Sequence, residues 1–103
     1  MRTVVVPYTV KPDRVDENQR LIEAVFAELA DRAPTGLRYA SLRLADGVSF
    51  VHIASIETDD GSNPLNDVAA FAEFTRDIAE RCDDPPVAHE AAVVGAFRLF
   101  SDT

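Results

Sequence analysis

The chain has 103 residues, 47% of them hydrophobic and 27% charged, and a formal net charge of −8. This length allows a single domain, residues 1–103, with one ordinary core, and the acidic balance without a basic run argues against a nucleic-acid binder, because phosphates would be repelled. The apolar run at the N-terminus is too short for a signal peptide or a membrane span, which predicts a cytoplasmic protein without membrane contact.

The first third of the chain predicts a strand followed by a long helix. Residues 3–11 are β-branched and apolar on both faces, which is typical of a covered strand, and Pro7 predicts a local irregularity because proline cannot donate a ladder hydrogen bond. A helix then opens with Asp13 as its expected N-cap, and Pro34 and Gly36 end it. Apolar residues recur along one face of this helix at steps of three and four: Val15, Ile22, Val25, Phe26, Leu29 and Ala33.

Residues 37–57 predict one β-hairpin whose register follows from its turn. Asp46 and Gly47 lie between two β-branched and aromatic runs and indicate a two-residue turn, in which both central residues need a positive φ. Counting outward sets Ala45 opposite Val48. The next pairs are Arg43 with Phe50, Leu42 with Val51, Ser41 with His52, Ala40 with Ile53 and Tyr39 with Ala54.

Side chains alternate along each strand, so the hairpin has two different surfaces. The first, called the plain face below, is small or aliphatic, and we expect helices to pack on it: Ala40, Leu42, Val51 and Ile53. The second, called the mixed face, combines aromatic, hydroxyl, imidazole and cationic groups: Tyr39, Ser41, Arg43, Phe50, His52, Ala54 and Ile56. A functional site is expected on the mixed face.

The second half of the chain predicts an acidic turn, a second helix and a last strand. Residues 58–63 form the turn, and Asn63 followed by proline is typical of a helix start. The single Cys82 cannot form an internal disulfide and is expected to be a small buried side chain at the helix end. Residues 88–100, apolar on both faces, predict a long strand in which Gly95 indicates a bulge. The second helix is expected to bury one stripe: Phe71, Phe74, Thr75, Ile78 and Cys82.

This order of elements predicts an α+β fold of the ferredoxin-like type, βαββαβ. Its four-stranded antiparallel sheet would carry two helices on one face, because two helices cover only one face of such a sheet. The other face would then expose a larger apolar patch than monomers usually tolerate, formed by Tyr39, Phe50, Ala54, Ile56 and half of the outer-strand residues. We therefore expect a homodimer that packs open sheet face against open sheet face through a two-fold axis.

The candidate catalytic residues are Ser41 and His52, which form a direct cross-strand pair. A histidine oriented by a hydroxyl can act as a general base near neutral pH. Tyr39 and Arg43 lie two positions to either side of Ser41, and Tyr8 is expected to join them from the first strand. With Phe50, these three form the candidate substrate-binding set for a small aromatic or acidic ligand. The alternative is that His52 is a hydrogen-bonded histidine that fills a dimer interface.

Three segments carry a resemblance to a known family. The stretches VKPDRVDENQRLIEAVFAEL, FVHIASIE and NPLNDVAAFAEFTRDIAERCDDPPV, in this order, resemble the dimeric α+β barrel superfamily, especially an uncharacterised branch of the small antibiotic biosynthesis monooxygenase-like proteins. The resemblance implies a cavity between sheet and helices. Some members use this cavity for cofactor-free oxidation of polycyclic phenols, and others use it for haem breakdown.

The sequence lacks residues that family members use for both of those activities. The active oxygenases bring a tryptophan and an asparagine into the cavity, whereas this chain has no tryptophan and its asparagines lie on or at the edges of the expected helices: Asn18, Asn63 and Asn66. Haem-degrading relatives use a histidine on the second helix, whereas His52 and His89 are expected in strands. The resemblance therefore supports the fold more strongly than either activity.

Two functions of different class follow. The first is a cofactor-independent monooxygenase-like enzyme, needing no cofactor or metal, in which His52 deprotonates a phenolic substrate and an apolar cavity shelters the carbanion that reacts with oxygen. The second is a non-catalytic dimeric module that binds a ligand or only itself. An empty cavity with His52 on its wall would favour the first function, and a filled core would favour the second.

Overall fold

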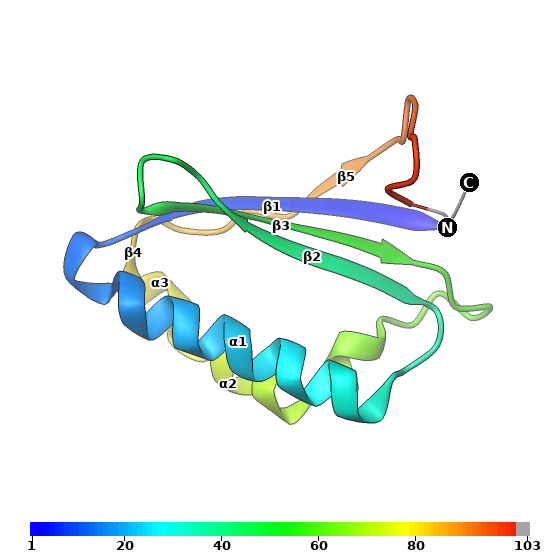
Figure 1. Ribbon diagram of the computed structural model, residues 1–103, viewed down its shortest axis with the longest axis horizontal. Coiled ribbons are helices and arrows are strands. Elements are labelled where there is room, and N and C mark those ends of the chain that lie inside the picture. Colours follow the sequence, from blue (N-terminus) through cyan, green and yellow to red (C-terminus); the bar gives the residue numbers. More distant parts are fainter. Residues whose placement is uncertain (101–103) are drawn as a thin grey trace.

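The computed structural model describes residues 1–100, which form an antiparallel sheet with helices on one face only (Figure 1). No helix in this part of the chain is long and apolar enough to cross a membrane. In chain order the elements are β1 (Arg2–Val10), a 3₁₀ turn (Pro12–Arg14), α1 (Val15–Arg32), β2 (Leu37–Arg43), β3 (Ser49–Ile56), a second 3₁₀ turn (Pro64–Asp67), α2 (Ala69–Thr75), α3 (Ile78–Arg81), β4 (Cys82–Asp84) and β5 (His89–Ala91).

The sheet has the order β2-β3-β1-β4, with β5 also paired to β1. β1 pairs with β3 along nearly its whole length, while its other edge is divided between β5, at Thr3 to Val5, and β4, at Thr9 and Val10. Pro7 lies between these two parts, where no strand needs its missing N–H. The irregularity expected at Pro7 is instead a register shift between Thr9 and Val10. The predicted ferredoxin-like α+β fold is confirmed, with five strands in place of four.

The long last strand predicted over residues 88–100 is wrong beyond Ala91. Ala91 pairs with Thr3, so only Arg2 and Met1 remain along β1 for any further pairing. The chain then leaves the sheet on the side opposite the helices, as Figure 1 shows. An apolar composition cannot make a strand where the partner strand has ended.

The register predicted for the hairpin is confirmed from Tyr39 opposite Ala54 to Arg43 opposite Phe50, but the turn differs. Only Gly47 has a positive φ, of 81°, and its N–H donates to the carbonyl of Leu44 at 3.0 Å. The Asp46 carboxylate accepts the N–H groups of Val48 and Ser49. Ala45 and Val48 are therefore loop residues, and the type of turn predicted from Asp46 and Gly47 is wrong while its register is right.

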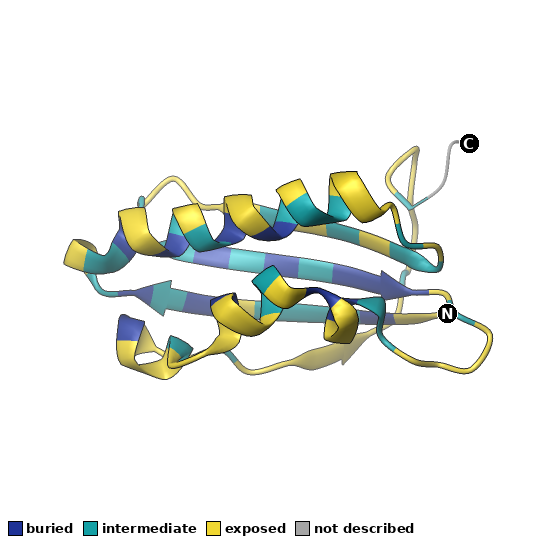
Figure 2. Cartoon of the chain, turned by 90° about the horizontal axis from the view of Figure 1, so that it is seen from below, coloured by how far each residue is buried: buried dark blue, intermediate teal, exposed yellow. Residues whose placement is uncertain are grey.

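The helices cover the mixed face, not the plain face as predicted, so the mixed face is not the open face that was expected to form the dimer. Phe50, His52, Ala54 and Ile56 lie under the helices and are each at most 9% exposed, whereas Leu42 on the plain face is 48% exposed. Figure 2 shows the buried residues of β1 and β3 beneath the helices. The physical reason is the apolar surface area that is buried, because large aromatic side chains contribute the most free energy when they leave water.

α1 packs on the sheet through its predicted apolar stripe. Val15, Ile22 and Val25 are buried, as expected from the three- and four-residue spacing. Asp13 lies within the preceding 3₁₀ turn and makes no side-chain cap, so its assignment as N-cap is wrong. The helix ends at Arg32, where Ala33 adopts a left-handed conformation, close to the predicted stop.

The predicted second helix is broken into three pieces. Asn63 starts the first piece as expected, its side chain accepting the N–H of Leu65 at 3.0 Å. The break between α2 and α3 falls at Asp77, whose φ is 56°. Glu28 of α1 accepts the first two N–H groups of α2 at 3.1 and 2.9 Å, and these contacts lower the pKa of its carboxyl group. The carboxylate of Glu28 thus ties the two helices together at the positive end of the α2 dipole.

Replacing Gly36 with alanine is expected to destabilise the protein by about 2 kcal/mol or more. Gly36 has a φ of 80°, and a Cβ there would lie 2.7 Å from Thr58 Cγ2. The left-handed conformation alone costs a non-glycine residue about 1–2 kcal/mol. Gly61 is the matched control, because its φ is 78° and no atom lies within 4 Å of the added Cβ. Urea denaturation should show a clearly larger loss for G36A than for G61A, and equal losses would contradict the close contact.

Candidate functional site

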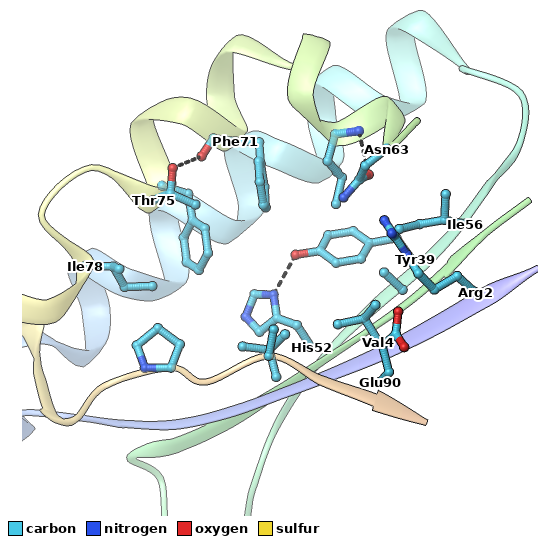
Figure 3. Close-up of a pocket in the computed structure, with 16 residues that line it drawn as sticks. Arg2, Val4, Tyr39, His52, Ile56, Asn63, Phe71, Thr75, Ile78 and Glu90 are labelled. Atoms are coloured by element: carbon cyan, nitrogen blue, oxygen red, sulfur yellow. Dashed lines mark hydrogen bonds between the residues drawn. The ribbon is translucent and has the colours of Figure 1, made fainter. Parts of the chain in front are cut away.

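A cavity of about 430 Å³ lies between the sheet and the α2 and α3 helices (Figure 3). Its walls are mostly apolar or aromatic, and His52 and Tyr39 contribute polar groups from the mixed face of the hairpin. Arg2 and Glu90, both exposed, lie on the sheet side of its lining and bring charges of opposite sign. The cavity therefore combines an apolar interior with a few localised polar groups, as small-molecule sites do.

His52 contacts three hydroxyl side chains that were predicted to share its site. Its Nδ1 lies 2.6 Å from the hydroxyl of Tyr39 and 3.1 Å from that of Ser41, and its Nε2 lies 2.7 Å from the hydroxyl of Tyr8. The imidazole is 5% exposed and stacks on Phe74 with ring centroids 5.2 Å apart. The structure thus brings His52, Ser41, Tyr39 and Tyr8 together, and both ring nitrogens are engaged within the protein.

Two further polar residues support this group from behind the cavity. Asn18 of α1 is 0% exposed and Arg81 of α3 is 3% exposed. The Asn18 amide donates to Tyr8 Oη at 3.0 Å, and Arg81 Nε donates to Asn18 Oδ1 at 3.3 Å. Arg81 also donates to the carbonyls of Phe74 and Arg76. Among residues 1–100, no buried side-chain nitrogen or oxygen lacks a hydrogen-bond partner.

Burial sets the charge state of these groups. It lowers the pKa of His52 to about 4, because a low-dielectric site disfavours the charged imidazolium. Burial also raises the pKa of Tyr39 to about 12, against the opposing effect of a hydrogen bond with Ser41, and it raises the pKa of Tyr8. At neutral pH the site therefore presents a neutral imidazole and two protonated phenols.

The chain is similar to known proteins in structure, whereas comparison of its sequence finds no match. No protein-family model matches the chain, and no curated protein matches its sequence. A candidate antibiotic biosynthesis monooxygenase from Nitrosomonas europaea superposes with a TM-score of 0.73 at 16% identity, over 92% of this chain and 100% of that one. Rv0793 from Mycobacterium tuberculosis gives 0.72 at 18% identity, over 92% and 96%. A further structure named antibiotic biosynthesis monooxygenase gives 0.69 at 18% identity, over 92% and 100%.

The chain has the fold of the antibiotic biosynthesis monooxygenase-like proteins. The resemblance noted in the order and pattern of its elements is confirmed at this level, and nearly the whole chain takes part in it. Within the described residues, no group of three or more His, Cys, Asp and Glu side chains is placed to hold a metal ion.

Three of the four predicted substrate-binding residues, Tyr8, Arg43 and Phe50, lie outside the lining of the cavity. Arg43 is exposed, and its guanidinium donates to the carbonyl of Gly47 at 3.0 Å and to Gln19 at 2.9 Å. Phe50 is buried and stacks on Tyr8 at 5.6 Å between ring centroids, so it supports Tyr8 from below. Ser41 is also outside it, so His52 and Tyr39 are the two predicted site residues that line the cavity.

Three residues that shape the site were not singled out from the sequence. Asn18 lies three residues after Val15 and four before Ile22, on the buried stripe of α1, so a polar residue on an apolar stripe was the available signal. Phe74 was expected in the core but not beside His52. Arg81 follows the break in the second helix, and no local pattern in the sequence indicates that it turns inward.

Stability is expected to fall by about 2 kcal/mol between about pH 7.5 and about pH 5 because of His52. Burial lowers its folded pKa to about 4, from 6.5 for a free imidazole. In this range the unfolded chain binds a proton that the folded protein does not, so acid favours unfolding. Urea denaturation at several pH values should show this slope in the wild type and its loss in H52Q. The matched control H89Q, at an exposed histidine, should keep it, and a slope retained in H52Q would contradict the assignment.

Proposed function

We propose that this chain is a small-molecule-binding protein of the monooxygenase-like type that takes a flat aromatic ligand into the cavity between sheet and helices. The observation that carries the proposal is a cavity of about 430 Å³ with a mostly apolar lining, on which His52 and Tyr39 supply hydrogen-bonding groups. Phe71 and Phe74 offer ring faces for stacking, and Tyr39 with His52 offers a directed polar contact. Arg2 is placed to pair with a carboxylate on an acidic ligand.

The enzyme reading is that the ligand is oxidised in this cavity without a bound cofactor. An apolar cavity would protect a carbanion formed from a phenolic substrate until it reacted with dioxygen. His52, held by Ser41 and Tyr39, would handle the substrate proton, and Tyr8 would hold the imidazole in place. These roles rest on the distances among the four side chains.

The alternative, binding without catalysis, has one observation in its favour. Both ring nitrogens of His52 are engaged by protein hydroxyls, and burial lowers its pKa to about 4, so the imidazole is a weak base without a free nitrogen toward the ligand. A non-catalytic module would show saturable binding and no oxygen uptake, whereas an oxygenase would consume oxygen with the same ligand.

The test is a thermal-shift and fluorescence titration of the purified protein with polycyclic phenols, flavins and haem. T75W should block the cavity, since Thr75 lies on its lining and is exposed. The matched control is E73W, two residues away and outside the lining. Saturable binding of a polycyclic phenol that T75W abolishes and E73W retains would support the proposal. No binding in the wild type, or equal binding in T75W, would contradict it.

We further propose that the plain face packs against a second copy to form a homodimer. This face carries no helix (Figure 1), and Leu42 on it is 48% exposed, while Leu44, just beyond β2, is 44% exposed. The segment that follows β5 on the same side of the sheet exposes Val94, Phe97 and Leu99 by 71% or more. We expect a second copy to cover these residues, because monomers rarely leave large apolar surfaces in water, and a two-fold axis would pair this face with itself.

Replacing Leu42 with glutamate is therefore expected to convert a dimer into a monomer. The carboxylate would be buried without a partner in the proposed interface, which is strongly unfavourable. Sedimentation velocity over a dilution series measures the mass directly. The matched control A24E adds the same charge on the exposed side of α1 and should leave the dimer intact. A wild type that sediments as a monomer at all concentrations would contradict the proposed dimer.

A further inference from the structure

One unbroken series of hydrogen bonds begins at Arg81, behind the cavity, and reaches His52 and Tyr39 on its wall. Arg81 Nε donates to Asn18 Oδ1 at 3.3 Å, and Asn18 Nδ2 lies 3.0 Å from Tyr8 Oη. A guanidinium has only donors, so the amide oxygen must face Arg81 and the amide NH₂ must face Tyr8. The direction of the first two hydrogen bonds is therefore fixed.

The direction of the remaining hydrogen bonds follows from this beginning. Tyr8 accepts from Asn18, so its own hydrogen is available for His52 Nε2, 2.7 Å away. The opposite arrangement, with Nε2–H donating to Tyr8, would leave a buried phenolic hydrogen without an acceptor, which is costly. His52 therefore carries its hydrogen on Nδ1, and this hydrogen is directed at the hydroxyl of Tyr39, 2.6 Å away.

We propose that Asn18 and Arg81 act as positioning residues that make the Tyr39 hydroxyl a hydrogen-bond donor toward the cavity. Tyr39 accepts from Nδ1–H and so cannot donate back to it, and its hydroxyl lies at the cavity wall (Figure 3). The cavity then selects flat ligands that present an acceptor oxygen, of the aryl-carbonyl class, over ligands that present only a donor. This inference rests on the proposed function and names the polarity of the ligand that the same site prefers.

Ser41 is the competing acceptor for the Tyr39 proton. Its hydroxyl lies 3.1 Å from the same ring nitrogen and within hydrogen-bonding reach of Tyr39, so in the empty protein Tyr39 can donate to Ser41 until a ligand displaces that contact. S41A removes this competitor and is expected to tighten binding of an acceptor ligand or leave it unchanged. A loss of acceptor preference in S41A would instead assign the donor role to Ser41 and overturn the role proposed for Tyr39.

Three tricyclic probes of nearly the same shape test the preference. Fluorenone has only an acceptor, carbazole has only an N–H donor, and fluorene has neither. Wild-type protein should bind fluorenone about five- to ten-fold more tightly than fluorene, the effect of one net hydrogen bond, and should bind carbazole no better than fluorene. Y39F should bind all three alike. Tighter binding of carbazole than of fluorenone by the wild type would overturn the proposal.

N18D is the sharpest variant, because it changes one atom that is buried behind the cavity. A carboxylate beside Arg81 accepts from both sides, so Tyr8 would donate to it, His52 Nε2–H would donate to Tyr8, and Nδ1 would accept the Tyr39 proton. The preference should reverse, with carbazole binding more tightly than fluorenone. A merely structural role for Asn18 would weaken both probes equally, and that result would contradict the proposal.

The nitrogen of His52 that carries the proton can be identified by NMR without any ligand. Nitrogen-15 NMR of the imidazole should show Nδ1 protonated and Nε2 unprotonated in the wild type. This measurement does not depend on the folding of any variant. Protonation at Nε2 would overturn the inference whatever the probes do. Protonation at Nδ1 with no probe bound would support the direction of the hydrogen bonds and contradict the proposed function, so the two failures are distinguishable.

Discussion

Replacing Phe74 with alanine is expected to lower the free energy of unfolding by about 3–5 kcal/mol, the usual cost of deleting a large buried aromatic side chain. Phe74 is 4% exposed and contacts rings on three sides, namely His52 at 5.2 Å, Phe71 at 6.1 Å and Tyr8 at 6.4 Å between centroids. The guanidinium of Arg81 lies 5.5 Å from its ring centre. The ring therefore joins the helices, the cavity and the buried polar group.

Urea denaturation at neutral pH measures this loss. The matched control is F97A, because the ring of Phe97 is 78% exposed and its removal should cost less than about 1 kcal/mol. F74L, which keeps much of the volume, should fall between F74A and the wild type. Similar losses for F74A and F97A would mean that Phe74 does not hold the helices on the sheet.

Breaking the buried hydrogen bond between Asn18 and Arg81 is the second large expected effect. N18L should destabilise the protein by about 2–4 kcal/mol, because it leaves a buried guanidinium and the Tyr8 hydroxyl each without one partner. Asn18 is 0% exposed and Arg81 3% exposed, so water cannot replace the lost contacts at the surface. Thermal and urea denaturation of the variant measure the loss.

A double-mutant cycle separates the hydrogen bond from the packing around it. R81M alone should also destabilise, whereas the double variant N18L/R81M should lose at least about 1 kcal/mol less than the sum of the single variants, because the guanidinium that N18L leaves buried without its partner is then absent. Additive losses would show that Asn18 and Arg81 contribute independently, and the directed series of hydrogen bonds would lose its physical basis.

The hairpin shows what local sequence can and cannot specify. The register was predictable because the loop length fixes which residues are opposite each other, even though the turn has only Gly47 at positive φ. Period-two alternation sorts side chains into two sets but does not say which set the helices cover. Here the aromatic set is covered, since Tyr39 stacks on Phe26 of α1 with centroids 5.2 Å apart, and an argument from aromatic area would have chosen the right face.

The C-terminal part shows that composition alone does not predict a strand. Residues 92–100 read as a strand because they are apolar, yet the register of Ala91 opposite Thr3 leaves almost no partner beyond it. Whether a segment pairs depends on a strand that lies far away in the sequence. The same segment, exposed at Phe97 and Leu99, is part of the surface proposed to meet a second copy.

The sequence was sufficient to predict the residues around His52 but not the buried residues that hydrogen-bond to them from the helices. Ser41 and His52 followed from the hairpin register, and Tyr8 reaches His52 because β1 pairs with β3. Asn18 and Arg81 come from helices whose placement on the sheet depends on the whole core. Local patterns can therefore place residues on one face, but the order of hydrogen bonds behind that face requires the tertiary structure.

The measurement that tests the central claim most directly is an NMR titration of the uniformly labelled wild-type protein with fluorenone. We predict saturable changes at the His52 ring and at residues lining the cavity, such as Phe71, Ile78 and Ala54, with a single affinity for all of them. Saturable changes confined to the plain face around Leu42, or none at all, would contradict the claim that the cavity beneath the helices is the ligand site.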